Sequence, residues 1–198
     1  MKRFYKVLLG TESSAAPGFH YNVDEVTVAH HWNPEATHPR VMGGFSIATD
    51  AALIRWIFRG NILYDVTIPE DAEVVYPERE PVTGELARVN KVILSNPRPM
   101  TDELAMQFYK ASKFTSKEDY YRILAGCAIC GYEKTCREIL KDHLTPETAQ
   151  ECLDVWKLFV KPDDYNHPFS PKLYLSIRKV LCILSDESNA TPKIPKNR

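Results

Sequence analysis

The first half of the chain contains short apolar runs that end at proline or glycine, a pattern typical of β-strands. Proline cannot donate a ladder hydrogen bond, so Pro69, Pro77 and Pro97 mark where three of these runs should stop as strands. The pattern predicts a mostly antiparallel sheet. Its expected strands cover residues 4–11, 25–29, 62–68, 73–76 and 90–94.

Between these runs, the segment from Asp50 changes to helical spacing. Its apolar residues recur three and four positions apart, at Leu53, Ile54, Ile57 and Phe58. Thr49 or Asp50 is expected to cap the start of this helix and Gly60 to close its end.

After Pro99 the pattern is helical throughout. Thr101 is a capping residue, and Asp102 and Glu103 place negative charge at the positive end of the helix dipole. Ser116 opens the next helix, and Gly131 ends it. Further helices are expected at 132–141, from Thr145 with Pro146, and from Ser170 with Pro171.

These elements predict an α+β fold, in which a mostly antiparallel sheet with short helices is followed by a helical C-terminal subdomain. A strand-rich part is expected over residues 1–98 and a helical subdomain over 99–184. Residues 185–198 are polar with almost nothing to bury, so we expect a disordered tail there.

Charge and cysteine content narrow the function classes. The formal net charge is −1, and the basic residues are scattered along the 198-residue chain, which argues against a nucleic-acid partner. No apolar run approaches the roughly 20 residues of a membrane span, so no membrane association is expected. The five cysteines all fall in helical segments, which favours reduced thiols and an intracellular, cytoplasmic location.

Segment 124–140 pairs two short helices around a glycine and resembles the helical hairpin of an ankyrin repeat. Stacked repeats need about three units to bury a continuous core, so we expect one packed hairpin here and no solenoid. Its Cys127, Cys130 and Cys136, with His143 following, offer zinc ligands. Thiols within a helix among apolar residues are more often packing residues, and no metal is expected.

Two further clusters have a chemical and a structural interpretation. Histidines around Trp32 can supply a base or a metal site, or can be ordinary loop residues (His20, His30, His31 and His38). Trp56 with Arg55 and Arg59 can form a stacking, anion-binding face, although tryptophan on such a helix is more often core. Phosphate loops of the Walker or Rossmann type and the nucleophile elbow are absent from the sequence.

Three segments of the first hundred residues carry a family resemblance. Leu8-Leu9-Gly10-Thr11 closes the first strand, Gly43-Gly44-Phe45-Ser46-Ile47-Ala48-Thr49 leads into the Asp50 helix, and an acidic loop with Glu78, Glu80 and Glu85 precedes the strand at Asn90. In order and spacing they resemble the ADP-ribosyltransferase superfamily. The resemblance covers about half of the chain and implies NAD as the substrate.

The resemblance assigns roles to five residues. Gly10 and Thr11 are similar to the glycine-threonine pair that grips the dinucleotide, and Phe45 and Ser46 to the aromatic-serine motif. Glu85 stands for the catalytic acid, because a carboxylate stabilises the positive charge that develops on the ribose when the nicotinamide bond breaks.

The implied function is transfer of ADP-ribose from NAD to a protein or small acceptor, with the helical half selecting the acceptor. The alternative is a catalytically silent module that keeps the fold and binds a protein through the hairpin. The sequence departs from the family pattern twice: Leu9 stands where the family usually has histidine or arginine, and the strand from Asn90 has no glutamate. The absence of that glutamate favours the alternative.

Overall fold

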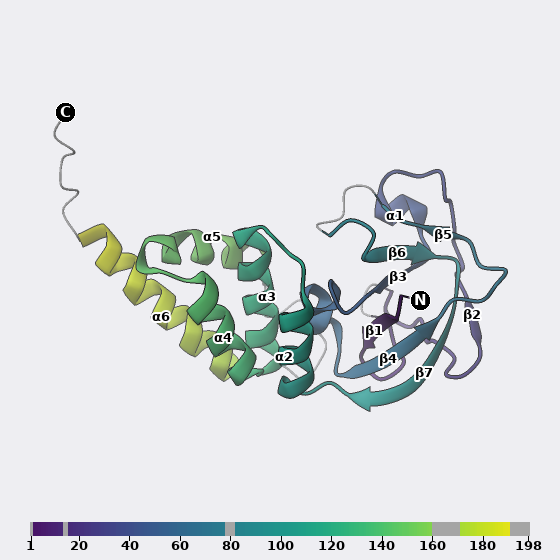
Figure 1. Ribbon diagram of the computed structural model, residues 1–198, viewed down its shortest axis with the longest axis horizontal. Coiled ribbons are helices and arrows are strands. Elements are labelled where there is room, and N and C mark those ends of the chain that lie inside the picture. Colours follow the sequence, from purple (N-terminus) through teal and green to yellow (C-terminus); the bar gives the residue numbers. More distant parts are fainter. Residues whose placement is uncertain (1, 14–15, 78–81, 160–170, 191–198) are drawn as a thin grey trace. The chain divides into compact units, whose positions relative to one another are not determined.

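The computed structural model describes residues 2–13, 16–77, 82–159 and 171–190 (Figure 1). Glu78, Glu80, Ser170 and the segment 191–198, which entered the sequence predictions, lie outside these residues. The fold is α+β, as predicted. The chain divides into two compact units, residues 1–115 and 116–198, and each is described by itself.

Unit 1 is built on a seven-stranded sheet with the order β2-β7-β4-β1-β3-β6-β5. Every neighbouring pair of strands is antiparallel, which confirms the predicted sheet type. β4 and β7 run side by side for most of their length (Figure 1). The strands are β1 (Phe4–Leu8), β2 (Val26–Val28), β3 (Phe45–Ala48), β4 (Ile62–Thr67), β5 (Val74–Val75), β6 (Leu86–Val89) and β7 (Lys91–Pro99).

Four strands differ from the prediction. β3 and β6 were not among the expected strands, β1 ends at Leu8 before residue 11, and β7 continues through Pro97 to Pro99 where a stop was predicted. The other neighbour of β7, strand β2, pairs only with its residues 91–93. The far half of β7 therefore has a partner on one side only, where a missing N–H is tolerated.

The helix expected from Asp50 is a 3-10 helix, η1 (Leu53–Arg59), and its predicted cap is wrong. Ala52 holds the cap position without a side-chain hydrogen bond. Gly60 does end the helix, in an extended conformation that any residue can adopt. It is needed there for close approach, because a Cβ at Gly60 would lie 2.0 Å from the backbone carbonyl carbon of Leu8.

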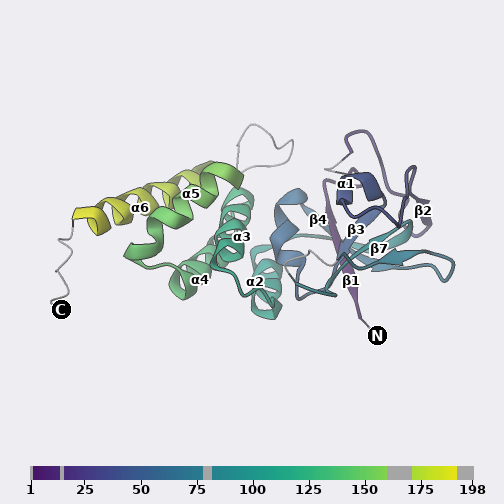
Figure 2. The same cartoon turned by 90° about the horizontal axis from the view of Figure 1, so that it is seen from above.

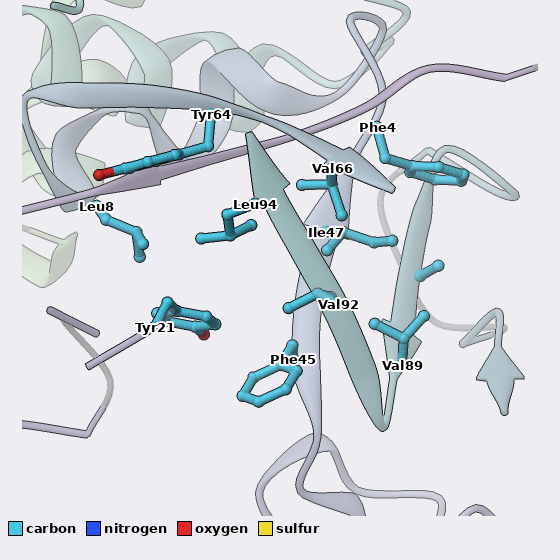
Figure 3. Packing of buried hydrophobic residues seen from close by; sticks show 11 residues of the cluster. Phe4, Leu8, Tyr21, Phe45, Ile47, Tyr64, Val66, Val89, Val92 and Leu94 are labelled. Atoms are coloured by element: carbon cyan, nitrogen blue, oxygen red, sulfur yellow. The ribbon is translucent and has the colours of Figure 1, made fainter. Parts of the chain in front are cut away.

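Both faces of the sheet in unit 1 carry buried residues, and Val7 and Leu63 lie on one of them. The core cluster on the other face is built from alternate residues of the strands (Figure 3). Phe4 and Leu8 contribute to it from β1, and Phe45 and Ile47 from β3. The short helix α1 (Pro39–Met42) and the helix α2 (Asp102–Ala111) complete the unit. The predicted Thr101 cap of α2 is confirmed, since its hydroxyl accepts a hydrogen bond from the Leu104 amide at 3.3 Å.

Unit 2 is helical, and α5 and α6 lie side by side in it (Figure 2). Gly131 ends α3 in the left-handed conformation, with φ of 80°, as predicted. α6 continues to Ala190, past residue 185, where the sequence predicted a tail to begin. The elements are α3 (Lys117–Cys130), α4 (Glu133–His143), η2 (Pro146–Thr148), α5 (Ala149–Phe159) and α6 (Pro171–Ala190).

The described helices include none that is long and apolar enough to cross a membrane.

Candidate anion-binding site

Unit 1 contains a cavity of about 850 Å³, which is within the usual size range of small-molecule sites. Cations, histidines and aromatic rings are prominent among the side chains that line it. The described lining includes no aspartate or glutamate. Its principal side chains are Lys6, Arg59 and Arg88, His30, His31 and His38, and Phe19, Tyr21 and Phe45.

Lys6 stands in the middle of β1, between Phe4 and Leu8 on the same face of the strand. Its ammonium donates a hydrogen bond of 2.8 Å to the backbone carbonyl of Ser46 and lies 5.2 Å from the centre of the Tyr21 ring. Burial, and then the positive charges of Arg59 and Arg88, lower the pKa of Lys6 to about 7. The cavity therefore holds a cation that gives up its proton near neutral pH.

Aromatic rings form one wall of the cavity. Figure 3 shows Tyr21 and Phe45 together at one end of the core, and their ring centres are 5.0 Å apart. Phe19 contacts both rings and also the imidazole of His30, at 5.1 Å between centres. A planar group of a ligand can pack against the faces and edges of these rings.

The loop before β3 closes another side of the cavity and is tied to the sheet. The Nε2 of His31 donates to the Val41 carbonyl at 2.7 Å, and the Gly44 amide donates to the His31 carbonyl at 2.9 Å. Arg88 on β6 donates to the Gly43 carbonyl at 2.8 Å. Gly43 has a φ of +71°, and a Cβ on it would lie 2.3 Å from the His31 carbonyl oxygen, so only glycine fits.

The structure brings together two of the five residues that the sequence singled out. Phe45 and Ser46 line the cavity, whereas Gly10, Thr11 and Glu85 do not belong to its described lining. The Gly10 carbonyl accepts a hydrogen bond of 3.0 Å from the Tyr64 hydroxyl, and the Thr11 hydroxyl lies 3.2 Å from Nδ1 of His20.

Glu85 lies just before β6, at the far end of the β3–β6 ladder from Phe45. That end is about 13 Å away at roughly 3.3 Å per residue. The hydroxyl of Thr49 donates to its carboxylate at 2.6 Å, and Lys2 and Lys113 each lie 3.5 Å from it. The Thr49 hydrogen bond lowers the pKa of Glu85; burial opposes this, and the two lysines add to it. Glu85 is therefore an ionised carboxylate with its own partners.

A second cavity, of about 870 Å³, lies by the start of β1 and the bulged part of β7. Asp65 is part of the lining of this cavity, and its carboxylate accepts hydrogen bonds from Arg98 at 2.7 Å and from Asn96 at 2.9 Å. Burial would raise the pKa of Asp65, but these hydrogen bonds and the charge of Arg98 lower it. Positive charge in this second cavity is thus partly neutralised by Asp65.

The described residues include no group of three or more histidines, cysteines or acids placed to hold a metal ion. Cys127, Cys136 and Cys152 are buried and form no disulfide with the described cysteines, and burial raises the pKa of Cys130 and of Cys152 to about 12. The thiols of Cys130 and Cys152 therefore stay protonated at neutral pH, as in thiols that serve as packing residues.

Comparison with models of known protein families, with curated proteins and with solved structures finds no match. The resemblance to ADP-ribosyltransferases therefore depends on the sequence motifs, and it stays a prediction. So does the ankyrin-like character of the hairpin.

Of the three cations in this cavity, Arg59 was predicted from the sequence as an anion-binding candidate, whereas Lys6 and Arg88 were not. A signal for Lys6 was present: in the run Phe4-Tyr5-Lys6-Val7-Leu8, alternation places the lysine on the face that carries Phe4 and Leu8. A charge on the core side of a strand indicates a partner or a ligand. Arg88 carried no such signal, because the strand that holds it was not expected.

Proposed function

We propose that this chain binds a phosphate-bearing nucleotide in the cavity of unit 1, and that NAD is that ligand. One observation carries the proposal: Lys6, Arg59 and Arg88 line a cavity whose described lining holds no acidic side chain. Guanidinium groups match phosphate oxygens in pairs, and a lysine adds a compact positive charge. Such a lining favours an anion with more than one negative charge.

The aromatic wall supports a nucleotide over a bare anion. Phe19 and Phe45 offer apolar ring surface to a base or to nicotinamide. Ser46 lies on the same cavity and can hydrogen-bond a ribose or an amide. Phe45 and Ser46 are also the residues that resemble the aromatic-serine motif of ADP-ribosyltransferases, which use NAD.

Two outcomes for bound NAD follow, and the geometry favours binding without transfer. Cleavage of the nicotinamide bond calls for a carboxylate near the ribose, and Glu85 is outside the described lining. The silent interaction module is thus the leading proposal, with a protein partner still to be identified. Mono-ADP-ribosyl transfer to a protein or small acceptor is the second, supported by Phe45 and Ser46 in the cavity.

The test is NAD titration of the full chain by calorimetry. Arg59→Gln is expected to weaken binding about tenfold or more, the scale of one charged hydrogen bond. Arg137→Gln is the matched control, because Arg137 is 76% exposed in unit 2. The NAD affinity of this variant should equal that of the parent chain. Absence of binding to the parent chain would refute the proposal.

A second assay separates the two outcomes. Chromatography of NAD incubated with the parent chain should show no release of nicotinamide if the module is silent. Release would establish turnover, and Glu85→Gln then decides the role of Glu85. If Glu85 is the catalytic acid, the variant should retain NAD binding and lose about a hundredfold or more of turnover. Unchanged turnover would exclude it.

A further inference from the structure

Lys6 lies where β1 and β3 stop pairing and separate. β1 pairs with β4 along its whole length, from Phe4 to Leu8. With β3 it forms a single pair, Tyr5 with Ala48. Continuing that register would bring Val7 opposite Ser46, but there the Ser46 carbonyl accepts its hydrogen bond from the Lys6 ammonium. A side-chain cation thus stands where the strands separate, and it opens on the cavity.

Groups from four parts of unit 1 surround this ammonium. Arg59 comes from η1 and Arg88 from β6, and both act on Lys6 by like charge. The Tyr21 ring lies 5.2 Å from it, and the loop before β3 adds His30, His31 and His38 to the same cavity. The Ser46 carbonyl and the Tyr21 ring are uncharged at neutral pH, so neither of these neighbours neutralises the ammonium.

Without an anion in the cavity, protonation of the Lys6 amine is less favourable than it is for a lysine in water. A bound anion makes this protonation more favourable. Burial and like charge act against the protonated ammonium, so near pH 7 part of the population carries neutral Lys6. A ligand with two negative charges next to Nζ reverses the local charge and favours the protonated form. Binding and protonation then stabilise each other, since the linkage is reciprocal.

We propose that the pyrophosphate of the ligand lies directly on Lys6, and that the chain takes up a proton from solvent as it binds. This inference rests on the proposed function, because it concerns the same cavity. It adds which group of the ligand contacts Lys6 and how binding depends on pH. A free pyrophosphate and a nucleotide pyrophosphate share the chemistry, and the experiment distinguishes them.

The experiment is calorimetry of the full chain with three probes: NAD, ADP-ribose and inorganic pyrophosphate. Proton uptake is measured with NAD or ADP-ribose, in buffers of different ionisation enthalpy, because their phosphates do not titrate near neutral pH. We expect uptake of about half a proton at pH 7 and almost none at pH 5.5, where Lys6 is already protonated.

Two substitutions separate charge from titration. Lys6→Met should weaken all three probes about tenfold or more. Lys6→Arg keeps a permanent charge, so it should retain binding and lose the proton uptake at pH 7. Lys110→Met, which removes an exposed lysine from α2, is the matched control and should change neither quantity. If either Lys6 variant fails to fold, the buffer series on the parent chain still tests the uptake.

The outcomes distinguish this inference from the proposed function. Pyrophosphate or ADP-ribose binding without NAD binding, with the Lys6 dependence intact, would retain the inference and refute NAD as the ligand. NAD binding that neither Lys6 substitution alters would retain the nucleotide site and overturn the inference. Uptake that persists in Lys6→Arg would assign the proton to another group and also overturn it. No binding of any probe would overturn both.

Discussion

The hydroxyl of Thr49 donates a hydrogen bond of 2.6 Å to the carboxylate of Glu85, and this contact joins the ends of β3 and β6. The Thr49 amide also donates to the Glu85 carbonyl at 2.9 Å. Glu85 has a structural role in this contact, which is independent of any role in catalysis. That structural role can be measured.

Glu85→Ala should lower the free energy of unfolding by about 1–3 kcal/mol at pH 7, since it leaves the Thr49 hydroxyl without its acceptor. Glu85→Gln should cost less, because the amide oxygen still accepts from Thr49 and each ion pair with lysine contributes at most about 1 kcal/mol. Urea unfolding of the three chains measures both differences.

The same residue predicts a pH dependence. Folding lowers the pKa of Glu85 below its ordinary value of about 4.3, so its charge stabilises the folded chain above that pH. This stabilisation is lost as the pH falls through the folded-state pKa. The stability difference between the parent and Glu85→Gln should therefore shrink as the pH falls below about 4.3. A difference that stays constant down to pH 3 would contradict the Thr49 contact.

The loop that closes the cavity can be tested by comparing alanine substitutions at two glycines, Gly43 in the loop and Gly10 outside it. Gly10 and Gly43 both have positive φ, +59° and +71°, so alanine at either should cost about 1–2 kcal/mol of backbone strain. No atom lies within 4 Å of a Cβ at Gly10, whereas one at Gly43 meets the His31 carbonyl oxygen at 2.3 Å. Gly43→Ala should cost a further 1–3 kcal/mol or so, as overpacked sites do.

Thermal unfolding of the two glycine variants gives the comparison. Gly43→Ala should also weaken NAD binding, because the Gly43 carbonyl accepts from Arg88 and the loop carries His31. Gly10→Ala should bind NAD as the parent does, since Gly10 is outside the described lining. Equal stability of the two variants would contradict the close approach at Gly43.

In unit 2, Trp156 is the largest of the fully buried side chains that the structure describes. It is 1% exposed, its indole N–H donates to the Tyr121 carbonyl at 3.0 Å, and its ring stacks on Tyr174. Trp156→Ala should cost about 3–5 kcal/mol. Leu158 is on the same helix and is 87% exposed, so Leu158→Ala should stay within about 0.5 kcal/mol of the parent. Urea unfolding followed by circular dichroism at helical wavelengths measures both.

Sequence alone predicted the features that depend on neighbouring residues. Gly131 and Thr101 act where they were expected to, because a left-handed helix end and a hydroxyl cap need only a few adjacent positions. Thr49 was expected to cap a helix by the same rule. Its side chain bonds Glu85 instead, and no local pattern reveals a partner so distant in sequence.

The site was predicted less well for the same reason. Phe45 and Ser46 were singled out by motif and do line the cavity. The role of Lys6 depends on the separation of β1 from β3 and on the nearby Arg88. Arg88 lies on β6, a strand that forms through its pairing with β3. Leu86–Val89 contains alanine and arginine and has little strand signal of its own.

The most direct test of the nucleotide site is an NMR titration of the isotope-labelled chain with NAD, which locates the ligand on the fold. NAD bound in the cavity around Lys6 should cause saturable shifts of the amide signals of Gly43, Gly44 and Ser46, at millimolar NAD or below, and leave those of Asn96 and Thr67 in the second cavity unmoved. Shifts confined to Asn96 and Thr67, or no shifts at all, would contradict this prediction.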